Sequence, residues 1–321
     1  MRTLVTGGTG FLGCRLVGKL LEKGHDVSVL YRSEEKRARL PEGVKGVRGD
    51  VLEPDSLAGC CEGMDTVFHV AGEVAWGRRL RSRMMEVNVH GTKHIVAEAL
   101  RAGVKRFVHT SSAAAVGFSP DAVTVDETFP FNGDALNNGY AIAKRRGEEE
   151  ALRAVEKGLS VVVVNPAVIL GPGSPSFVRM VAEGKLSVAP AGGISLCGVE
   201  DVVRGHILAA EKGRSGERYI LGGTNWEMRE AFQQIAEVAG TPRSIHRMGR
   251  MLALGAAALA EIQGWVAGRD AAFAWDLGRL TGWYAWYSSE KAERELGYRC
   301  TPLETILHPL VGPENIIRSS G

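Results

Sequence analysis

The chain has 321 residues, of which 45% are hydrophobic and 24% are charged, the composition of an ordinary globular protein. A formal net charge of +2 gives no reason to expect nucleic acid or an acidic membrane surface as partner. The five cysteines form no C-x-x-C pair and no metal-ligand spacing, so no metal site is expected. No signal-peptide pattern opens the chain, and its longest apolar stretch, Met251 to Ala260, is far shorter than a membrane span. These features predict a cytoplasmic protein with no membrane partner.

Strand and helix patterns alternate through the first half of the chain. Continuous apolar runs predict strands at 3–6, 27–31, 44–47, 66–70, 106–109 and 161–164. Helical spacing of apolar residues predicts helices at 11–23, 82–102 and 139–157, the first of which should end at Gly24. Strands without polar alternation are typical of a sheet covered by helices on both faces. We therefore expect an α/β fold with a Rossmann-type, doubly wound parallel sheet.

The pattern changes after residue 170, where loops lengthen and tryptophans concentrate. We expect residues 1–170 to form the Rossmann domain and 171–321 to form mainly a smaller C-terminal substrate lobe. Part of 199–225 is expected to return to the Rossmann sheet. The segment Met251 to Trp265 is apolar at helical spacing, which predicts a buried helix or pocket lid. The tryptophans between 275 and 286 are expected in the core of the lobe.

A glycine-rich loop lies between the first strand and the first helix. Gly7, Gly10 and Gly13 form G-x-x-G-x-x-G, a variant of the dinucleotide-binding pattern. The first glycine permits a tight turn, the second a close approach of the pyrophosphate, and the third close packing of helix on strand. Phe11 and Leu12 open the helix, whose N-terminal N–H groups attract phosphate. The loop predicts a bound NAD or NADP.

The end of the second strand bears on the choice between these two cofactors. NAD-binding proteins usually carry a carboxylate there, for the ribose hydroxyls. This chain has Tyr31 followed by Arg32, whose guanidinium can bind a 2′-phosphate. We therefore expect NADP (as NADPH) to be preferred, with NAD as the alternative.

Tyr140 and Lys144 lie four residues apart near the start of a predicted helix, so their side chains project from one face. An ammonium close to a phenol favours the phenolate and lowers its pKa, which suits proton exchange with a carbonyl oxygen. Upstream, Thr110 to Ser112 follow a predicted strand, where such sheets place ligands. We expect Tyr140, Lys144 and a serine of this segment to be catalytic.

The order of glycine loop, serine and Tyr-x-x-x-Lys resembles the extended branch of the short-chain dehydrogenase/reductase superfamily. The resemblance covers nearly the whole chain and rests on Thr6–Gly13, Gly49–Val51, His69–Gly72, Asn88–Thr92, Thr110–Ser112, Tyr140–Lys144, Asn165–Pro166, Val199–Asp201 and Glu295–Tyr298. It implies that Ser112, directly before the run of alanines from 113 to 115, is the catalytic serine rather than Ser111. It also implies that Asp50 and Val51 hold the adenine and that Asn165 and Pro166 border the nicotinamide. It further implies cofactor contacts for Val70, Ala71, Gly72, Thr110, Val168 and the catalytic pair Tyr140 and Lys144.

Within that branch, the segments 164–173 and 216–223 look most like dihydroflavonol 4-reductase-like proteins, which reduce ketones or aldehydes with NADPH. An NAD-dependent sugar-nucleotide epimerase or dehydratase is the alternative, although Ala115 to Gly117 replace the Tyr-Gly common in epimerases. A second alternative is an NAD(P)-sensing protein without turnover. The partner is then a small-molecule carbonyl compound or a sugar nucleotide, and a homodimer is left open. Asn88 could join a proton relay, and Trp76, Arg79 or Arg81 could contact substrate.

Overall fold

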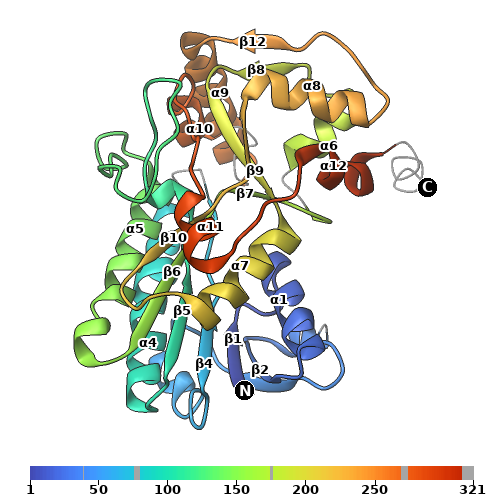
Figure 1. Ribbon diagram of the computed structural model, residues 1–321. Helices are drawn as coiled ribbons and strands as arrows, with labels where there is room; N and C mark the ends of the chain where they lie inside the picture. Colours follow the sequence, from blue (N-terminus) through green and yellow to red (C-terminus); the bar gives the residue numbers. More distant parts are fainter. Residues whose placement is uncertain (39, 76–79, 174–175, 269–273, 313–321) are drawn as a thin grey trace.

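A computed structural model gives the structure of residues 1–38, 40–75, 80–173, 176–268 and 274–312 (Figure 1). Its centre is a seven-stranded parallel sheet of order β10-β6-β5-β4-β1-β2-β3. The strands are β1 (Arg2–Thr6), β2 (Asp26–Tyr31), β3 (Lys45–Arg48), β4 (Thr66–His69), β5 (Arg106–Thr110), β6 (Ser160–Pro166) and β10 (Arg218–Leu221). The expected α/β fold with a Rossmann-type parallel sheet is confirmed.

The strand order reverses between β1 and β4, which lie side by side although β2 and β3 intervene in the chain. Thr6 at the end of β1 pairs with His69 at the end of β4, and His69 pairs with His109 of β5. The loops that follow these strands therefore leave the sheet at one edge. In doubly wound sheets, ligands bind at this reversal point.

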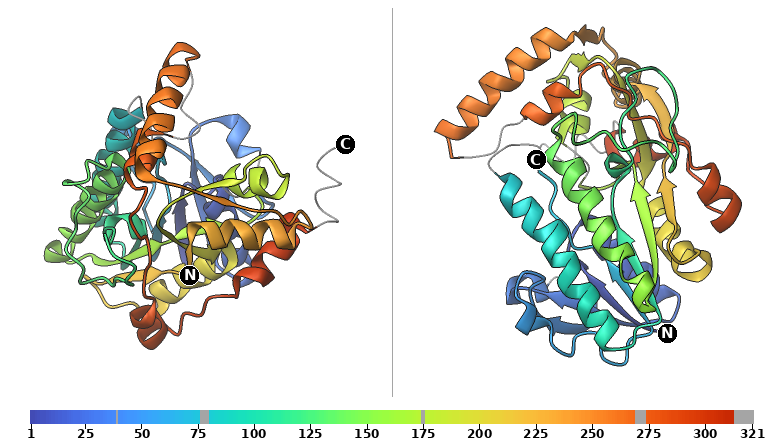
Figure 2. Two further views of the ribbon diagram at one scale, coloured as in Figure 1. Left: turned by 90° about the horizontal axis from the view of Figure 1, so that it is seen from above. Right: turned by 90° about the vertical axis from the view of Figure 1, so that its left-hand side faces the viewer.

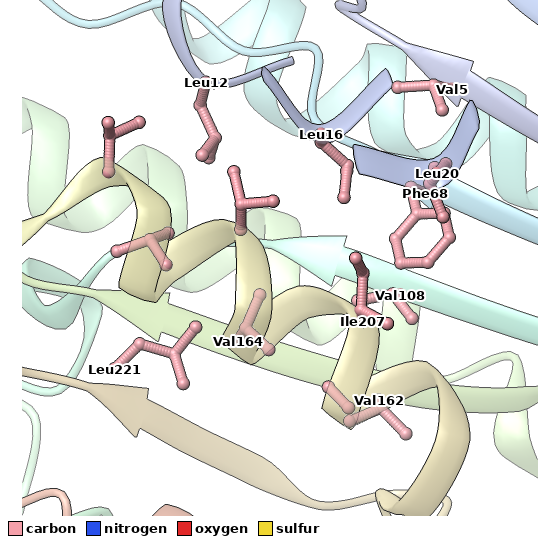
Figure 3. Close-up of a cluster of buried hydrophobic side chains, with 14 of the residues drawn as sticks. Val5, Leu12, Leu16, Leu20, Phe68, Val108, Val162, Val164, Ile207 and Leu221 are labelled. Carbon is pink, nitrogen blue, oxygen red and sulfur yellow. The ribbon is translucent and has the colours of Figure 1, made fainter. Parts of the chain in front are cut away.

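Helices cover both faces of the sheet, as the apolar strands predict (Figure 1). On one face, α1 (Phe11–Glu22) and α7 (Val199–Lys212) bury their apolar sides, and Figure 3 shows Leu16, Leu20 and Ile207 turned toward Val108 and Val162 of the sheet. On the other face lie α4 (Gly91–Arg101) and α5 (Gly139–Leu152). Gly24 ends α1 with a left-handed φ of +76°, as expected.

The helix expected over 82–102 is divided into three parts. It begins as α3 (Arg81–Met85), widens into a π-helical turn over Glu86–His90, and continues as α4. A π turn inserts one extra residue, which apolar spacing alone does not reveal. The third strand begins one residue later than expected, at Lys45, and α2 (Glu34–Arg37) precedes it.

The second half of the chain adds a lobe above the carboxyl-terminal ends of the strands (Figure 1). Its sheets are β11-β9-β7 and β12-β8. The bounds are β7 (Val168–Leu170), β8 (Val188–Pro190), β9 (Gly193–Gly198), β11 (Thr224–Glu227) and β12 (His246–Met248). Its helices are α6 (Ser176–Ala182), α8 (Met228–Val238), α9 (Arg250–Val266), α10 (Trp275–Arg279) and α12 (Leu303–Val311). Helix α11 (Glu290–Leu296) instead packs on α7 and β10, and its Ala292 and Leu296 are buried in the core of the central sheet. The packed core of this lobe joins α6, α8 and α12 to β8 and β9.

Helix α9 contradicts the expectation of a buried helix over Met251 to Trp265. Only Ala253, Ala257 and Gly264 of this helix are buried, whereas Met251 and Trp265 are 84% and 81% exposed. Apolar spacing identifies such a segment as a helix but does not say which side a neighbour covers. Figure 2 shows α9, in orange, at the edge of the molecule, projecting from the lobe. In the part of the chain that the structure describes, no helix has both the length and the apolar character needed to cross a membrane.

Candidate active site

The glycine loop is shaped for close approach of another group. Gly7 has a φ of +69°, and a Cβ there would lie 2.6 Å from the backbone nitrogen of Ala71. A Cβ on Gly13 would lie 2.2 Å from the Gly7 carbonyl oxygen. Any side chain at either position would push the loop away from the strand ends. Among the residues that the structure describes, no side chain caps the N-terminus of α1, so its first N–H groups are available for an anion.

The loop after β4 is fixed to β1 by a buried histidine. The His69 ring bonds the Thr6 hydroxyl through Nδ1 at 2.7 Å and the Thr92 hydroxyl through Nε2 at 3.1 Å. The Ala71 N–H donates to the same Thr6 hydroxyl at 3.2 Å. Burial lowers the pKa of His69 to about 3, so the ring is neutral at physiological pH. Its role is to hold the loop carrying Val70 to Gly72 against the glycine loop.

Arg32 and Asp50 lie together beyond the ends of β2 and β3. The Arg32 Nη1 is 3.9 Å from the Asp50 Oδ2, and the Arg32 side chain remains 46% exposed. The other Asp50 oxygen, Oδ1, accepts a hydrogen bond from the Leu52 N–H at 3.0 Å. Val51 between them is buried against Gly91. Asp50 is the one ion partner of Arg32 among the described residues, and at this distance it leaves most of the guanidinium N–H donors available.

The candidate catalytic residues converge at the ends of β5 and the start of α5. The side chain of Ser112 hydrogen-bonds the Tyr140 phenol. The Lys144 Nζ, one helical turn further, donates to the Thr110 carbonyl oxygen at 3.1 Å. A Cβ on Gly72 would lie 2.9 Å from the Lys144 Nζ. The glycine at position 72 thus leaves the ammonium open toward the loop after β4.

Burial governs the protonation of both groups. It raises the pKa of the Tyr140 phenol, and the Ser112 hydrogen bond opposes that change. Burial lowers the pKa of Lys144 from 10.5 to about 8, against the attraction of Glu148. The expected lowering of the Tyr140 pKa by Lys144 is not found, because the pKa of the phenol is raised and Lys144 is not among the groups that shift it. Burying a phenolate costs free energy, and this cost is the reason that the pKa of Tyr140 is raised.

Asn88 occupies the π turn and fixes the loop after β4. Its Oδ1 accepts from the Glu73 N–H at 3.0 Å, and its Nδ2 donates to the Glu73 carbonyl at 2.8 Å. A Cβ on Gly147 of α5 would lie 2.4 Å from the Asn88 carbonyl oxygen, so the two helices cross closely here. Both amide atoms of the side chain are therefore engaged in structure, and a role in a proton relay stays a prediction.

Sequence reasoning missed a buried charged cluster beneath the catalytic pair. Glu148 is 1% exposed, and its carboxylate lies 2.9 Å from the Arg218 Nε and accepts from the Asn165 Nδ2. The Asn165 Nδ2 also donates to the Ser112 carbonyl at 2.9 Å. The cluster thereby joins α5, β6 and β10 behind the serine. The spacing Tyr140, Lys144, Glu148 along one helix face was the available signal.

The start of α5 is held by a residue from the far end of the lobe. The carboxylate of Asp276 in α10 accepts from the Gly139 N–H at 2.9 Å, and the Asn138 side chain accepts from the Ala141 N–H at 2.9 Å. Asp276 is 6% exposed, and its burial raises the pKa of its carboxyl group. A negative group at a helix N-terminus is favourable, so this contact stabilises the helix that carries Tyr140.

The Tyr140 ring lies in an apolar cluster, which we call the Tyr140 cluster. Its other buried members are Ala75, Met84, Ala114, Phe118, Leu136, Ala141 and Ala143. The half-buried residues that border it are Leu80, Met85, Phe131, Leu280, Trp283 and Ala285. Most of these side chains come from residues 1–170, and the lobe adds Leu280, Trp283 and Ala285 at the border of the cluster.

The remaining expected residues are two cofactor contacts and three substrate contacts. Pro166 is the last residue of β6, at the carboxyl-terminal edge of the central sheet, and Val168 lies half-buried in β7 beyond that edge. The Arg81 Nη2 donates to the Asn137 side chain at 2.8 Å, which ties it to the loop before α5. Trp76 and Arg79 lie outside the described residues.

The residues present fit a dinucleotide. The glycine loop and the uncapped start of α1 suit a diphosphate. The basic Arg32 lies beyond the end of β2, and the buried Lys144 of α5 contacts the end of β5, with β1 and β4 between these two strands. This arrangement can hold a nicotinamide cofactor with its reactive ring near Tyr140.

Comparison with known proteins agrees with this geometry. A family model described as the NAD dependent epimerase/dehydratase family matches residues 3–222. A putative dihydroflavonol 4-reductase from Synechocystis sp. is 32% identical over 304 residues, which cover 91% of this chain and 88% of that protein. Sterol demethylase protein B from Methylococcus capsulatus is 35% identical over 250 residues, 76% of each chain. The crystal structure of gox2253 matches with a TM-score of 0.84 at 31% identity and covers 99% of this chain and 98% of that one.

The matched region contains the whole glycine loop and the Tyr-x-x-x-Lys pair, and the relatives extend the likeness through the lobe. The chain belongs to the NAD-dependent epimerase/dehydratase family of extended short-chain dehydrogenases/reductases, and it is an NAD(P)-dependent oxidoreductase.

Proposed function

We propose that the protein is an NADPH-dependent reductase of a ketone or aldehyde group on a mostly apolar molecule. The observation that carries this proposal is the packing of the Tyr140 phenol, which interacts with Ser112, among the apolar side chains of the Tyr140 cluster, which line its ring. A sugar nucleotide, the substrate of the alternative activity, would bring hydroxyl groups that this cluster offers few partners. The sterol in the name of one relative is a substrate class that suits such a lining.

The chain's own groups handle the proton and the orientation of the carbonyl. When bound, the nicotinamide supplies the hydride that goes to the carbonyl carbon. The Tyr140 hydroxyl donates its proton to the carbonyl oxygen, and Ser112 donates a hydrogen bond to the same oxygen. The Lys144 ammonium stabilises the phenolate that remains and holds the nicotinamide ribose. In the direction of alcohol oxidation, the Tyr140 phenolate accepts the proton instead.

The cofactor would lie along the strand ends, with residues 1–170 as its domain and 171–321 as mainly the substrate lobe. Its diphosphate would lie on the loop formed by Gly7, Gly10, Phe11, Leu12 and Gly13. The adenine would contact Asp50 and Val51, and the nicotinamide half would contact Val70, Ala71, Gly72, Thr110, Asn165, Pro166 and Val168. Arg32 would bind the 2′-phosphate of NADPH, because its ion pair with Asp50 at 3.9 Å is too long to satisfy its donors.

The test is a panel of carbonyl compounds, from sugar nucleotides to steroid ketones, with NADPH consumption as the readout. We expect turnover with apolar ketones or aldehydes and none in the Tyr140→Phe variant. Absorbance of the freshly purified protein in the nicotinamide band gives a second criterion, since epimerases recycle a retained cofactor. Retained NAD together with turnover of sugar nucleotides alone would contradict the proposal.

A further inference from the structure

Helix α9 packs on the lobe through small side chains. Its buried residues are Ala253, Ala257 and Gly264, which recur along one side of the helix. They allow α10 to approach closely, since a Cβ on Gly278 would lie 2.7 Å from the Ala257 Cβ. Glu261, the one acidic residue of α9, also turns toward this side, because its carboxylate accepts from the Trp275 N–H at 3.0 Å. The side of α9 that contacts protein is therefore already occupied.

The opposite side of α9 is exposed and apolar, and we call it the outer face. It consists of Met251, Leu252, Leu259, Ile262, Trp265 and Val266, all of which are exposed by more than half. Projected at about 100° per residue, they fall on an arc of about 140° with no charged residue among them. Both views of Figure 2 show this helix at the edge of the molecule. Large apolar side chains on a projecting helix mark an interaction surface.

The N-terminal end of α9 is basic. His246, Arg247 and Arg250 are exposed there, immediately before or at the first turn of the helix. Among the described residues, no ion pair involves Arg247 or Arg250. This end of the outer face therefore carries positive charge that is available to an anionic partner, while the face itself carries none.

We propose that the outer face of α9 docks on the surface of an anionic phospholipid bilayer, with the helix parallel to the membrane plane. Helices that lie in the interface combine an apolar face, basic residues and a tryptophan near the headgroups, which are the features collected here. A bilayer crossing is not available to α9, because a helix of 17 residues spans about 26 Å, less than the hydrocarbon core. The near-neutral net charge of the chain does not reveal this surface, because attraction to anionic lipid depends on the basic residues next to the membrane.

A second protein is the poorer fit to this surface. Protein interfaces surround their apolar core with a polar, often charged rim that fixes the register of the partners. Between Met251 and Ala260 the helix has no polar side chain on any side, and Glu261 beyond it turns inward. A lipid surface can bind the helix without a specific alignment, and its acyl chains can cover an apolar face that has no polar rim. This inference does not depend on the proposed substrate.

Flotation of the full-length protein with vesicles tests the proposal. Wild type should float with vesicles of phosphatidylcholine and phosphatidylglycerol in equal amounts, and much less with phosphatidylcholine alone. Ile262→Glu places a charge at the centre of the outer face and should lower the partition coefficient about tenfold or more. Ala256→Glu is the matched control, since it adds the same charge to an exposed position of the same helix outside the face. It should float like wild type, and both variants should melt like wild type.

Two further measurements separate lipid from other occupants. Acyl-brominated lipids should quench tryptophan fluorescence in wild type, and Trp265→Phe should remove most of that quenching. Arg247→Gln with Arg250→Gln should reduce binding to anionic vesicles about tenfold and leave the weak binding to neutral ones unchanged. A wild type that does not float, or an Ile262→Glu variant that floats equally well, overturns the proposal. A third result would also overturn it: a protein that does not bind vesicles and forms a dimer in light scattering, which Ile262→Glu dissociates. The partner of the outer face would then be a second copy of this chain.

Discussion

Replacing Lys144 by Met should make the cofactor-free protein more stable at neutral pH while abolishing its chemistry. Lys144 is 6% exposed, and its burial lowers its pKa from 10.5 to about 8. The difference between these values, at about 1.4 kcal/mol per pH unit, corresponds to a cost of about 3 kcal/mol for keeping the ammonium buried at pH 7. Losing the hydrogen bond to the Thr110 carbonyl costs about 1 kcal/mol. The net gain in the free energy of unfolding is therefore about 2 kcal/mol.

The sign of the pH dependence follows from the same numbers. Because the folded pKa lies below the unfolded one, the unfolded chain binds more protons at Lys144 between pH 8 and pH 10.5. Stability from this group therefore rises with pH across that window. The advantage of Lys144→Met should be largest at pH 7, shrink above pH 8 and reach zero at about pH 10, where the remaining burial cost equals the lost hydrogen bond.

Urea unfolding of wild type and variant at a series of pH values from 7 to 10 measures this difference. Other titrating groups cancel, because the two proteins differ only at this position. Lys185→Met is the matched control, since Lys185 is 68% exposed and should show no comparable pH-dependent difference. A Lys144→Met variant less stable than wild type by the same amount at every pH would refute the reasoning, because the buried ammonium would then carry no cost.

Three further outcomes concern catalysis and cofactor. Tyr140→Phe should lower the chemical rate about 10²–10⁴-fold with little change in NADPH affinity, and a variant above about a tenth of the wild-type rate in a chemistry-limited assay would contradict the assignment. Ser112→Ala should slow the chemical step more than Ser111→Ala does, since Ser112 hydrogen-bonds the phenol; single-turnover rates that reverse this order would shift the assignment by one residue. Arg32→Ala should weaken NADPH binding about ten- to a hundredfold and barely change NADH binding, and wild type that binds NADH as tightly as NADPH in titrations would remove its role.

Local chemistry made the sheet and the glycine loop predictable. Gly7 needs a positive φ and Gly24 ends a helix, and both requirements are written in a few neighbouring residues. The π turn at Glu86–His90 was not predictable, because it is favoured by the close crossing of Gly147 under Asn88, a contact between distant segments. Tertiary packing decides such a feature, and apolar spacing does not record it.

In the candidate site too, residues with a local sequence signal could be predicted, and those that depend on distant contacts could not. Tyr140 and Lys144 were identified by their spacing on one helix, and Glu148 follows on the same face at the same interval. Its importance depends on Arg218, 70 residues later in the chain, which places a guanidinium within 2.9 Å of the carboxylate. The outer face of α9 was misjudged for a related reason, since burial depends on which neighbours exist rather than on the helix alone.

The contact between Asp276 and Gly139 has a consequence for the order in which the chain matures during synthesis. Six of the seven strands of the central sheet are complete at Pro166, whereas the carboxylate that caps the helix bearing Tyr140 is added 137 residues after Gly139. A nascent chain can therefore assemble most of its nucleotide-binding sheet well before the start of α5 is secured. Catalytic competence comes last, because a nascent chain that has not reached residue 276 lacks one of the two groups that hold the start of α5, with Asn138 as the other.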